Sequence, residues 1–244
     1  MELFCEYHTV VTNFEHAVKA ARTIRRKISE EAYDFIHRCC GSYEAQKADA
    51  IYRFVQEGLR MGRAVMSHLT APYMQTLFAI ERNFTNESHF FIEILRFEEL
   101  ENGTLFGRIN PKSEVLPYLA DHFADRFAGE QWVIADTVHR TVLLHKANYK
   151  TVYLSMDEVD MDELTLTYSE DEKQLQKLWK LFVDTIAIKE RVNPKLQRQM
   201  LPLRFRKYMK EFSKCTDPQM LDQKSNDWRS IFLWLNIVLN LKRK

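Results

Sequence analysis

The sequence has few of the residues that break or bend a chain. Only 6 glycines and 6 prolines occur among 244 residues, so together they fill 12 positions, about 5%, where an average protein has about 12%. A chain with so few turn-forming residues favours long helices. Hydrophobic residues make up 45% and charged residues 28%, an ordinary globular composition with enough length for a substantial core.

Neither sign of charge is in excess. Lysine and arginine total 35 against 34 aspartate and glutamate residues, which gives a formal net charge of +1. A generally basic protein that coats polyanions is therefore excluded, and any surface for nucleic acid must be local.

The sequence lacks the closely spaced cysteine pairs that form zinc or redox sites. Of the four cysteines, Cys39 and Cys40 are adjacent, and no C-x-x-C pair occurs. Adjacent cysteines rarely bridge each other, and zinc and redox sites need closely spaced pairs. The first six residues have no basic region and no long apolar run, so they do not resemble a secretory signal. We therefore expect free thiols and a cytoplasmic protein.

The usual enzyme signatures are missing as well. No H-E-x-x-H, G-x-S-x-G, phosphate-binding loop or dinucleotide fingerprint occurs, which disfavours a standard hydrolase, kinase or NAD enzyme. We assign no metal ligands and no cofactor. Whether the protein is an enzyme stays open at this point.

What the sequence does contain is a change of hydrophobic period along the chain. Apolar residues follow helical spacing through residues 13–92, are mixed through residues 93–156, where short alternating runs flank a predicted helix near residues 115–127, and return to helical spacing in residues 171–212. Asn102-Gly103 lies between two alternating runs and predicts a hairpin, because both residues tolerate a positive φ. We therefore predict an α+β fold: an N-terminal helical bundle, a small central antiparallel sheet, and C-terminal helices.

The extent of the helical and alternating spacing predicts the domain boundaries. Residues 1–212 form one predicted domain, which begins with a strand at residues 3–11, and Asp171 is expected to cap its last long helix. Residues 213–244 form a tail in which the run 230–241 is mostly apolar. That run is too short to span a bilayer, which needs about 20 residues. It is an interfacial anchor or a helix docked on the core, and we do not count a membrane among the partners.

Two neighbouring segments carry opposite charge. Residues 157–172 hold eight acids and no base, whereas residues 189–214 hold nine bases and two acids. The basic segment predicts a surface that contacts phosphates, with Phe205, Tyr208 and Phe212 available to stack on bases. The alternative is a solvated face, or a stripe that pairs with the acidic segment inside the protein.

A histidine between carboxylates predicts a candidate catalytic site. On a continuous helix, His89, Glu93 and Arg96 share one face and Glu87 points elsewhere, whereas on an extended chain Glu87, His89 and Glu93 share a face. We expect Glu87, His89 and Arg96 to meet where helix gives way to strand, with His89 moving a proton. The alternative is a structural network in which Arg96 neutralises Glu87.

A long run near the C-terminus resembles a family signature. Residues 188–208, called the signature segment below, match the pattern ERxNPxLQRQxxPxRYxKY at nearly every fixed position, with Phe205 in place of tyrosine. Upstream, Glu87-Ser88-His89 and Leu95-Arg96-Phe97 resemble the E-x-H and L-R-F stretches of the same family, with Glu93 where glycine is usual. Further matches are Val115-Leu116-Pro117, His122-Phe123, Arg126-Phe127 and Trp132-x-Ile134-x-Asp136.

Together these stretches resemble, over residues 3–212, a bacterial family described as DNA metabolism or DNA repair proteins, whose C-terminal part is a domain of unknown function. Members usually begin with an extra strand and helix before the equivalent of Leu3, and residues after Ser213 look unlike the family's ending. Relatives are encoded beside a radical-SAM protein thought to modify or repair DNA. Similar domains are fused to uracil-DNA-glycosylase-type domains. The resemblance implies a role in nucleic-acid maintenance.

Three functions stand as hypotheses. The first is a nucleic-acid-binding accessory of a DNA repair or modification system, with DNA and the radical-SAM protein as partners. The second is an enzyme acting on damaged or uracil-containing DNA, with Glu87, His89 and Arg96 in its site. The third is a protein-interaction module whose basic segment docks an acidic partner. For the first, the residues expected to contact nucleic acid are Arg191, Asn193, Lys195, Gln197, Arg198, Arg204 and Lys207.

Overall fold

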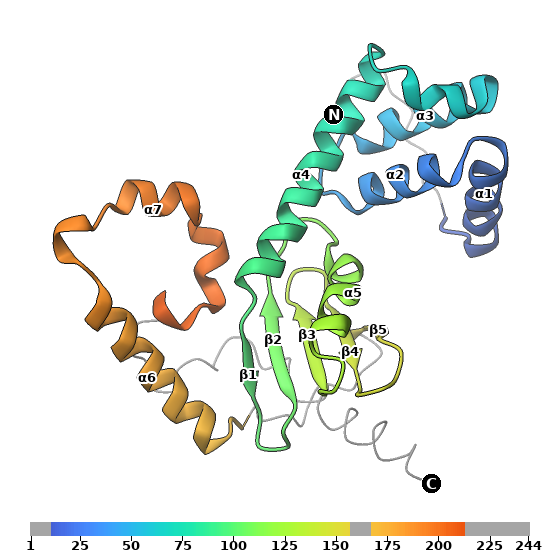
Figure 1. Ribbon diagram of the computed structural model, residues 1–244. Coiled ribbons are helices and arrows are strands. Elements are labelled where there is room, and N and C mark those ends of the chain that lie inside the picture. Colours follow the sequence, from blue (N-terminus) through green and yellow to red (C-terminus); the bar gives the residue numbers. More distant parts are fainter. Residues whose placement is uncertain (1–10, 157–166, 213–244) are drawn as a thin grey trace, which may run out of the picture. The chain divides into compact units, whose positions relative to one another are not determined.

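The computed structural model describes residues 11–156 and 167–212 (Figure 1). Its contacts divide the chain into two compact units, Met1–Thr85 and Asn86–Lys244, and each unit is described by itself. Nearly all of the strand predicted at residues 3–11, most of the acidic segment and the whole tail lie outside the described residues.

The first unit is a bundle of helices. Ser29 accepts a hydrogen bond from the backbone N–H of Ala32 at 3.0 Å and so begins the second helix. The rings of Phe35 and Phe54 pack with their centroids 5.8 Å apart, in a core that also contains Met74. The predicted N-terminal helices are thus confirmed. They are α1 (Phe14–Lys27), α2 (Glu30–Gly41), α3 (Lys47–Met61), the 3-10 helix η1 (Gly62–Ser67) and the first part of α4 (Pro72–Ile94).

The second unit contains a five-stranded sheet with the strands in chain order. The first two strands form the predicted hairpin, in which Gly103 has a φ of +74° and the Asn102 side chain accepts from the N–H of Thr104 at 3.0 Å. The α+β class, with helices before and after a central sheet, is confirmed. The strands are β1 (Phe97–Glu99), β2 (Leu105–Ile109), β3 (Trp132–Asp136), β4 (Thr141–His145) and β5 (Val152–Ser155).

The sheet is mixed, which corrects the expectation of a purely antiparallel one. Strands β2 and β3 pair in parallel, with Leu105 opposite Trp132, while the other three pairs are antiparallel. The reason is the connection between them: helix α5 (Leu116–Arg126) carries the chain back to the end of the sheet where β2 began, and such a crossover makes neighbouring strands parallel.

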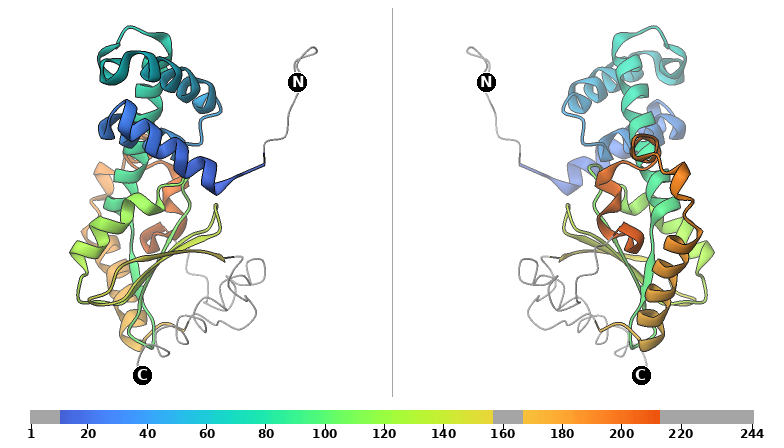
Figure 2. Two further views of the ribbon diagram at one scale, coloured as in Figure 1. Left: turned by 90° about the vertical axis from the view of Figure 1, so that its right-hand side faces the viewer. Right: turned by 90° about the vertical axis from the view of Figure 1, so that its left-hand side faces the viewer.

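The two faces of the sheet have different neighbours (Figure 2). On one face, the rings of Phe97 and Trp132 pack around Phe123 of α5, with centroids 5.3 and 6.3 Å from it. Side chains alternate along a strand, so Glu98 and Arg108 point to the opposite face. There they meet residues of the C-terminal helices, which are α6 (Glu170–Ile186), η3 (Lys189–Arg191), α7 (Pro194–Met200), η4 (Leu203–Tyr208) and η5 (Lys210–Phe212).

Candidate functional site

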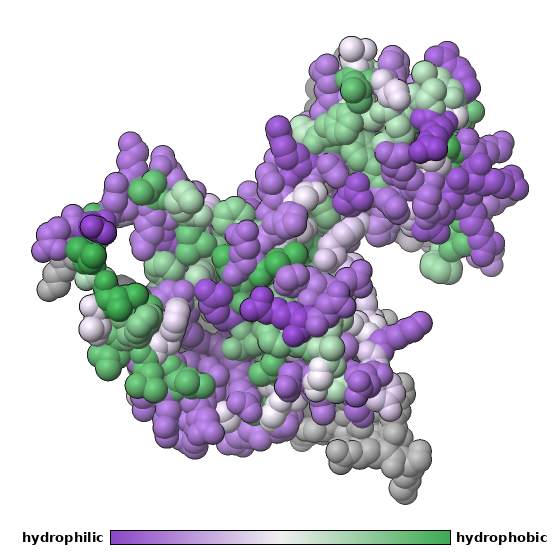
Figure 3. Space-filling model, in the orientation of Figure 1, coloured by the Kyte–Doolittle hydropathy of each residue, from purple (hydrophilic) through white to green (hydrophobic). Residues whose placement is uncertain are grey.

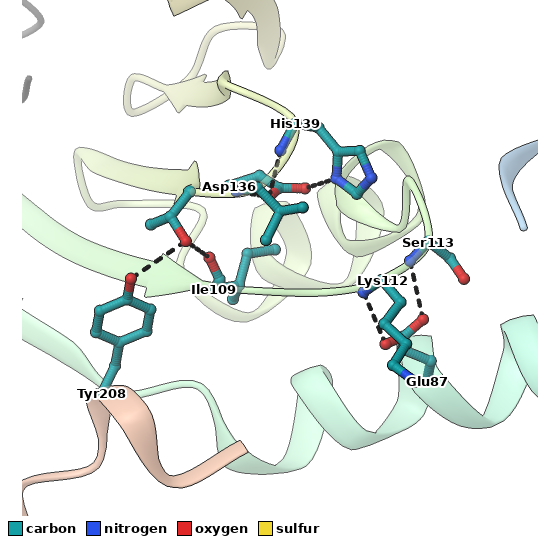
Figure 4. Close-up of polar contacts among 9 residues, drawn as sticks. Glu87, Ile109, Lys112, Ser113, Asp136, His139 and Tyr208 are labelled. Atoms are coloured by element: carbon teal, nitrogen blue, oxygen red, sulfur yellow. Dashed lines mark hydrogen bonds and ion pairs between the residues drawn. The ribbon is translucent and has the colours of Figure 1, made fainter. Parts of the chain in front are cut away.

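Glu87 lies at the centre of a buried polar contact in the second unit. Its side chain is almost completely buried, and its two carboxylate oxygens accept hydrogen bonds of 3.0 Å from the backbone N–H groups of Lys112 and Ser113 (Figure 4). The guanidinium of Arg204 donates to the same carboxylate at 2.6 Å. Burial alone would raise the pKa of Glu87, but these hydrogen bonds and the Arg204 charge outweigh it and lower the pKa.

The structure does not bring the three predicted catalytic residues together, which corrects that expectation. Helix α4 continues without a break to Ile94, so His89 lies two residues, or about 200°, around the helix from Glu87 and is exposed. Arg96 follows the end of the helix, where its guanidinium lies 3.4 Å from the backbone oxygen of Glu93. The predicted junction between helix and strand falls too late in the chain to turn these side chains toward one another.

Several fixed residues of the signature segment bind the protein itself. The Asn193 side chain accepts from the N–H of Leu196 at 3.0 Å and caps α7. The Gln197 side chain accepts from Arg206 at 3.3 Å, and Arg204 is paired with Glu87. Asn193, Gln197 and Arg204 were predicted to contact nucleic acid, and the structure gives each of their side chains a contact within the protein.

The other four predicted nucleic-acid residues lie at the surface. Arg191, Lys195, Arg198 and Lys207 are all exposed. Among the residues that the structure describes, Arg191, Lys195 and Arg198 form no ion pair, and the ammonium of Lys207 lies 4.9 Å from the centroid of the Tyr208 ring. These cations are therefore available to a partner from solvent.

The aromatic residues of the basic segment, residues 189–214, anchor it and are not free for stacking on bases. Phe205 is 4% exposed and stacks on Phe90 with ring centroids 4.7 Å apart. The hydroxyl of Tyr208 donates to Thr137 Oγ1 at 3.2 Å (Figure 4). Phe212 is half-buried beneath the guanidinium of Arg206. The expectation that Phe205 is available to bases is therefore wrong, because α4 covers it.

Charged side chains on one face of the sheet hold the residues that follow the signature segment. Glu98 of β1 is buried and forms ion pairs with Lys210 and Arg108. Arg108 also lies 3.3 Å from the hydroxyl of Tyr168, and burial together with the Glu98 charge raises the pKa of that hydroxyl. The partners are up to 112 residues apart, so no local pattern in the sequence could have predicted this cluster.

A second polar pair lies where β3 ends, and sequence reasoning missed it. Asp136 is fully buried, and its carboxylate accepts from the backbone N–H groups of Val138 and His139 at 2.9 and 3.2 Å. The same carboxylate lies 2.6 Å from Nδ1 of the His139 ring, whose side chain is 22% exposed (Figure 4). Burial raises the pKa of Asp136 despite these contacts. The available signal was an acid at the end of a strand with a histidine three residues later.

The Asp136–His139 pair has one arrangement found in proton-transfer sites. A buried carboxylate that contacts one imidazole nitrogen fixes the ring and leaves the other nitrogen to exchange a proton. The described residues 11–156 and 167–212 contain no group of three histidines, cysteines or acids placed to hold a metal ion. In the same part of the chain, no helix is both long enough and apolar enough to cross a bilayer.

These observations define an α+β protein in which a C-terminal segment is attached to a mixed sheet and to a long helix. A family model described as a domain of unknown function, DUF4130, matches residues 45–211. The match covers more than half of the chain, so the protein belongs to this family. It includes the sheet, the whole signature segment, and Glu87 with its three partners. No curated protein and no solved structure matches the chain.

Proposed function

We propose that this protein is a nucleic-acid-binding accessory of a DNA repair or DNA modification system. The observation that supports this function best is that the basic side chains of the signature segment fall into two groups, one bound to the protein itself and one exposed to solvent. Its Arg204 and Arg206 bind the protein's own Glu87, Gln197 and Leu201. Arg191, Lys195, Arg198 and Lys207 are left exposed on a segment that the other contacts hold in place.

Such an arrangement suits phosphates for a physical reason. Exposed lysine and arginine side chains bind a phosphate backbone by releasing its condensed counterions, and this contribution does not depend on sequence. With a net charge of only +1 over the whole chain, a local group of cations is what would direct nucleic acid to one surface. The family resemblance supplies the biological setting, in which a radical-SAM protein of DNA repair or modification is the second partner.

The test measures binding of a fluorescein-labelled 20-nucleotide DNA, as a single strand and as a duplex, by fluorescence anisotropy over a range of KCl concentrations. Arg198→Ala and Lys207→Ala should each reduce the slope of log K against log salt by about 0.9 for the duplex and about 0.7 for the single strand. Arg82→Ala is the matched control, because Arg82 is an exposed arginine of the first unit. Unchanged affinity and slope in both test variants would contradict the proposal.

A second candidate function is an enzyme acting on damaged or uracil-containing DNA. The Asp136–His139 contact of 2.6 Å favours it, in place of the separated residues Glu87, His89 and Arg96. Turnover would be followed with an oligonucleotide that contains one uracil. His139→Ala should abolish product formation while leaving the melting temperature nearly unchanged. Absence of product with the unmodified protein would remove this substrate from consideration.

A further inference from the structure

Helix α6 carries an apolar stripe that faces solvent. Leu175, Leu178, Trp179, Phe182 and Ile186 recur at helical spacing, so they share one side of the helix. Each is between 43% and 59% exposed. Figure 3 shows apolar side chains gathered over this helix.

The helix is attached to its unit by polar contacts and not by its apolar stripe. The Glu172 carboxylate accepts from the backbone N–H of Glu99 in β1 at 3.3 Å, and Gln176, one turn later in the same helix, donates to that carboxylate at 2.7 Å. The backbone N–H of Ser169 also donates to the Glu99 carbonyl at 3.1 Å. An amphipathic helix normally buries its apolar side, so this inverted attachment leaves a surface that a partner can cover.

Two aromatic rings form the centre of the stripe. Trp179 and Phe182 lie with their ring centroids 5.9 Å apart and their planes inclined by 29°, and they are 43% and 53% exposed. Unlike the rings of Phe205 and Tyr208, these two rings are exposed enough for a base to stack on them. Flat exposed rings of this kind provide a surface on which bases can stack.

The same part of the chain is positively charged. Between Leu175 and Leu203 the sequence has six bases against two acids, Asp184 and Glu190, so its formal charge is +4. The six bases are Lys177, Lys180, Lys189, Arg191, Lys195 and Arg198. Exposed aromatic rings combined with excess positive charge are the composition of surfaces that bind single-stranded nucleic acid.

We infer that residues 175–203 bind single-stranded nucleic acid, with bases stacked on Trp179 and Phe182 and phosphates on Arg191, Lys195 and Arg198. This inference rests on the proposed function and names its substrate class. A duplex is the poorer ligand, because its bases are already stacked on one another and would leave the apolar stripe in water. A second copy of the chain is disfavoured because it would place the excess positive charge of residues 175–203 against the same residues of its partner.

The experiment compares the full chain and its variants on one labelled 20-nucleotide DNA and on the duplex that it forms with its complement. The single strand should bind more tightly. Trp179→Ala and Phe182→Ala should each weaken its binding by at least about five-fold, the lower end of what one stacked base contributes, and should leave duplex binding unchanged. Trp179→Phe should retain most of the affinity. Tyr52→Ala, which removes a 66% exposed aromatic of α3, is the control and should have no effect.

Tryptophan fluorescence gives a second measurement. A base stacked on Trp179 should quench part of the emission, and Trp179→Phe should abolish that part while the strand still binds. Trp132 is fully buried, and the Trp179→Phe variant reports the background from all other tryptophans. The changes in affinity and in fluorescence quenching should not reflect a change in stability, because the Trp179 and Phe182 rings are half exposed.

The possible outcomes separate this inference from the proposed function. If neither the strand nor the duplex binds, the proposed function fails and the inference fails with it. If both bind equally and Trp179→Ala changes neither affinity nor quenching, the nucleic-acid function stands and the inference is overturned. The apolar stripe would then be left to a protein partner. Tighter binding of the single strand, sensitive to Trp179 and Phe182 alone among the tested aromatics, supports the inference.

Discussion

Arg204 donates a 2.6 Å hydrogen bond to Glu87 although 117 residues separate them. This contact joins the signature segment to helix α4, and the backbone N–H groups of Lys112 and Ser113 complete the set of donors around the carboxylate. Two stretches that resemble the family pattern, E-x-H and the arginine of the signature, are therefore explained in part by one structural contact.

Removal of Arg204 should destabilise the second unit. Arg204→Ala leaves the buried Glu87 carboxylate without its cation, so we expect the free energy of unfolding to fall by about 2 kcal/mol, the scale for a buried charged group that loses a hydrogen bond. Urea denaturation measures this change. The stability losses of Arg204→Ala and Glu87→Gln as single variants should add up to more than the loss in the double variant, because both substitutions remove the same interaction. Strict additivity would show that the contact contributes nothing to stability.

The same carboxylate should make stability depend on pH in the acid range. The pKa of Glu87 is lower in the folded protein than its ordinary value of 4.5, so its stabilising effect is present above pH 4.5 and is lost as the pH falls through the folded-state value. Urea midpoints of the unaltered protein and of Glu87→Gln, measured from pH 6 down to pH 3, should therefore converge toward the acid end. A difference that stays constant over this range would contradict the assignment.

Phe205 should act on stability and not on binding. Its ring is buried against Phe90 and Phe91, with centroids 4.7 and 5.2 Å away, so Phe205→Ala should cost about 3–5 kcal/mol through loss of buried surface and the cavity left behind. At a temperature where the variant remains folded, its affinity for DNA should equal that of the unaltered protein. Weaker binding with unchanged stability would mean that the ring stacks on nucleic acid.

The two members of the Asp136–His139 pair should differ in their effect on folding. Asp136→Ala removes a fully buried group and leaves the N–H groups of Val138 and His139 without their acceptor, so we expect a loss of about 1–3 kcal/mol. His139→Ala should cost less, because the carboxylate keeps both backbone donors and the ring is partly in solvent. Thermal unfolding of both variants at pH 7 makes the comparison. An equal or larger loss for His139→Ala would assign the ring a mainly structural role.

Much of the fold could be predicted because it depends on neighbouring residues. Asn102-Gly103 predicted a hairpin, and the positive φ of Gly103 confirms the turn chemistry. The change from helical to alternating spacing near residue 94 coincides with the end of α4 at Ile94. Even here the boundary detail differed: Asp171 was expected to cap α6, whereas the Ser169 side chain accepts from the N–H of Glu172 at 3.0 Å. Ser169 and Asp171 are both capping residue types, and spacing alone could not choose between them.

Charge and composition also identified residues 189–214 as basic, but they did not show which of these cations face solvent. Arg204 and Lys210 are taken up by Glu87 and Glu98, while Arg198 is exposed. The aromatic residues also differ in exposure, since Phe205 is buried and Trp179 is exposed. Each of these outcomes depends on what another part of the chain places opposite the side chain.

The sequence by itself therefore determined the elements whose physics is local: helical and alternating periods, one tight turn, and a segment rich in positive charge. Tertiary structure decided everything that joins distant residues. It made β2 and β3 parallel through α5, gave Glu87 the partner Arg204 instead of Arg96, and set His139 beside a buried Asp136. The physical reason is that backbone conformation depends on interactions within a few residues, whereas burial and charge pairing depend on which surfaces the folded chain brings into contact.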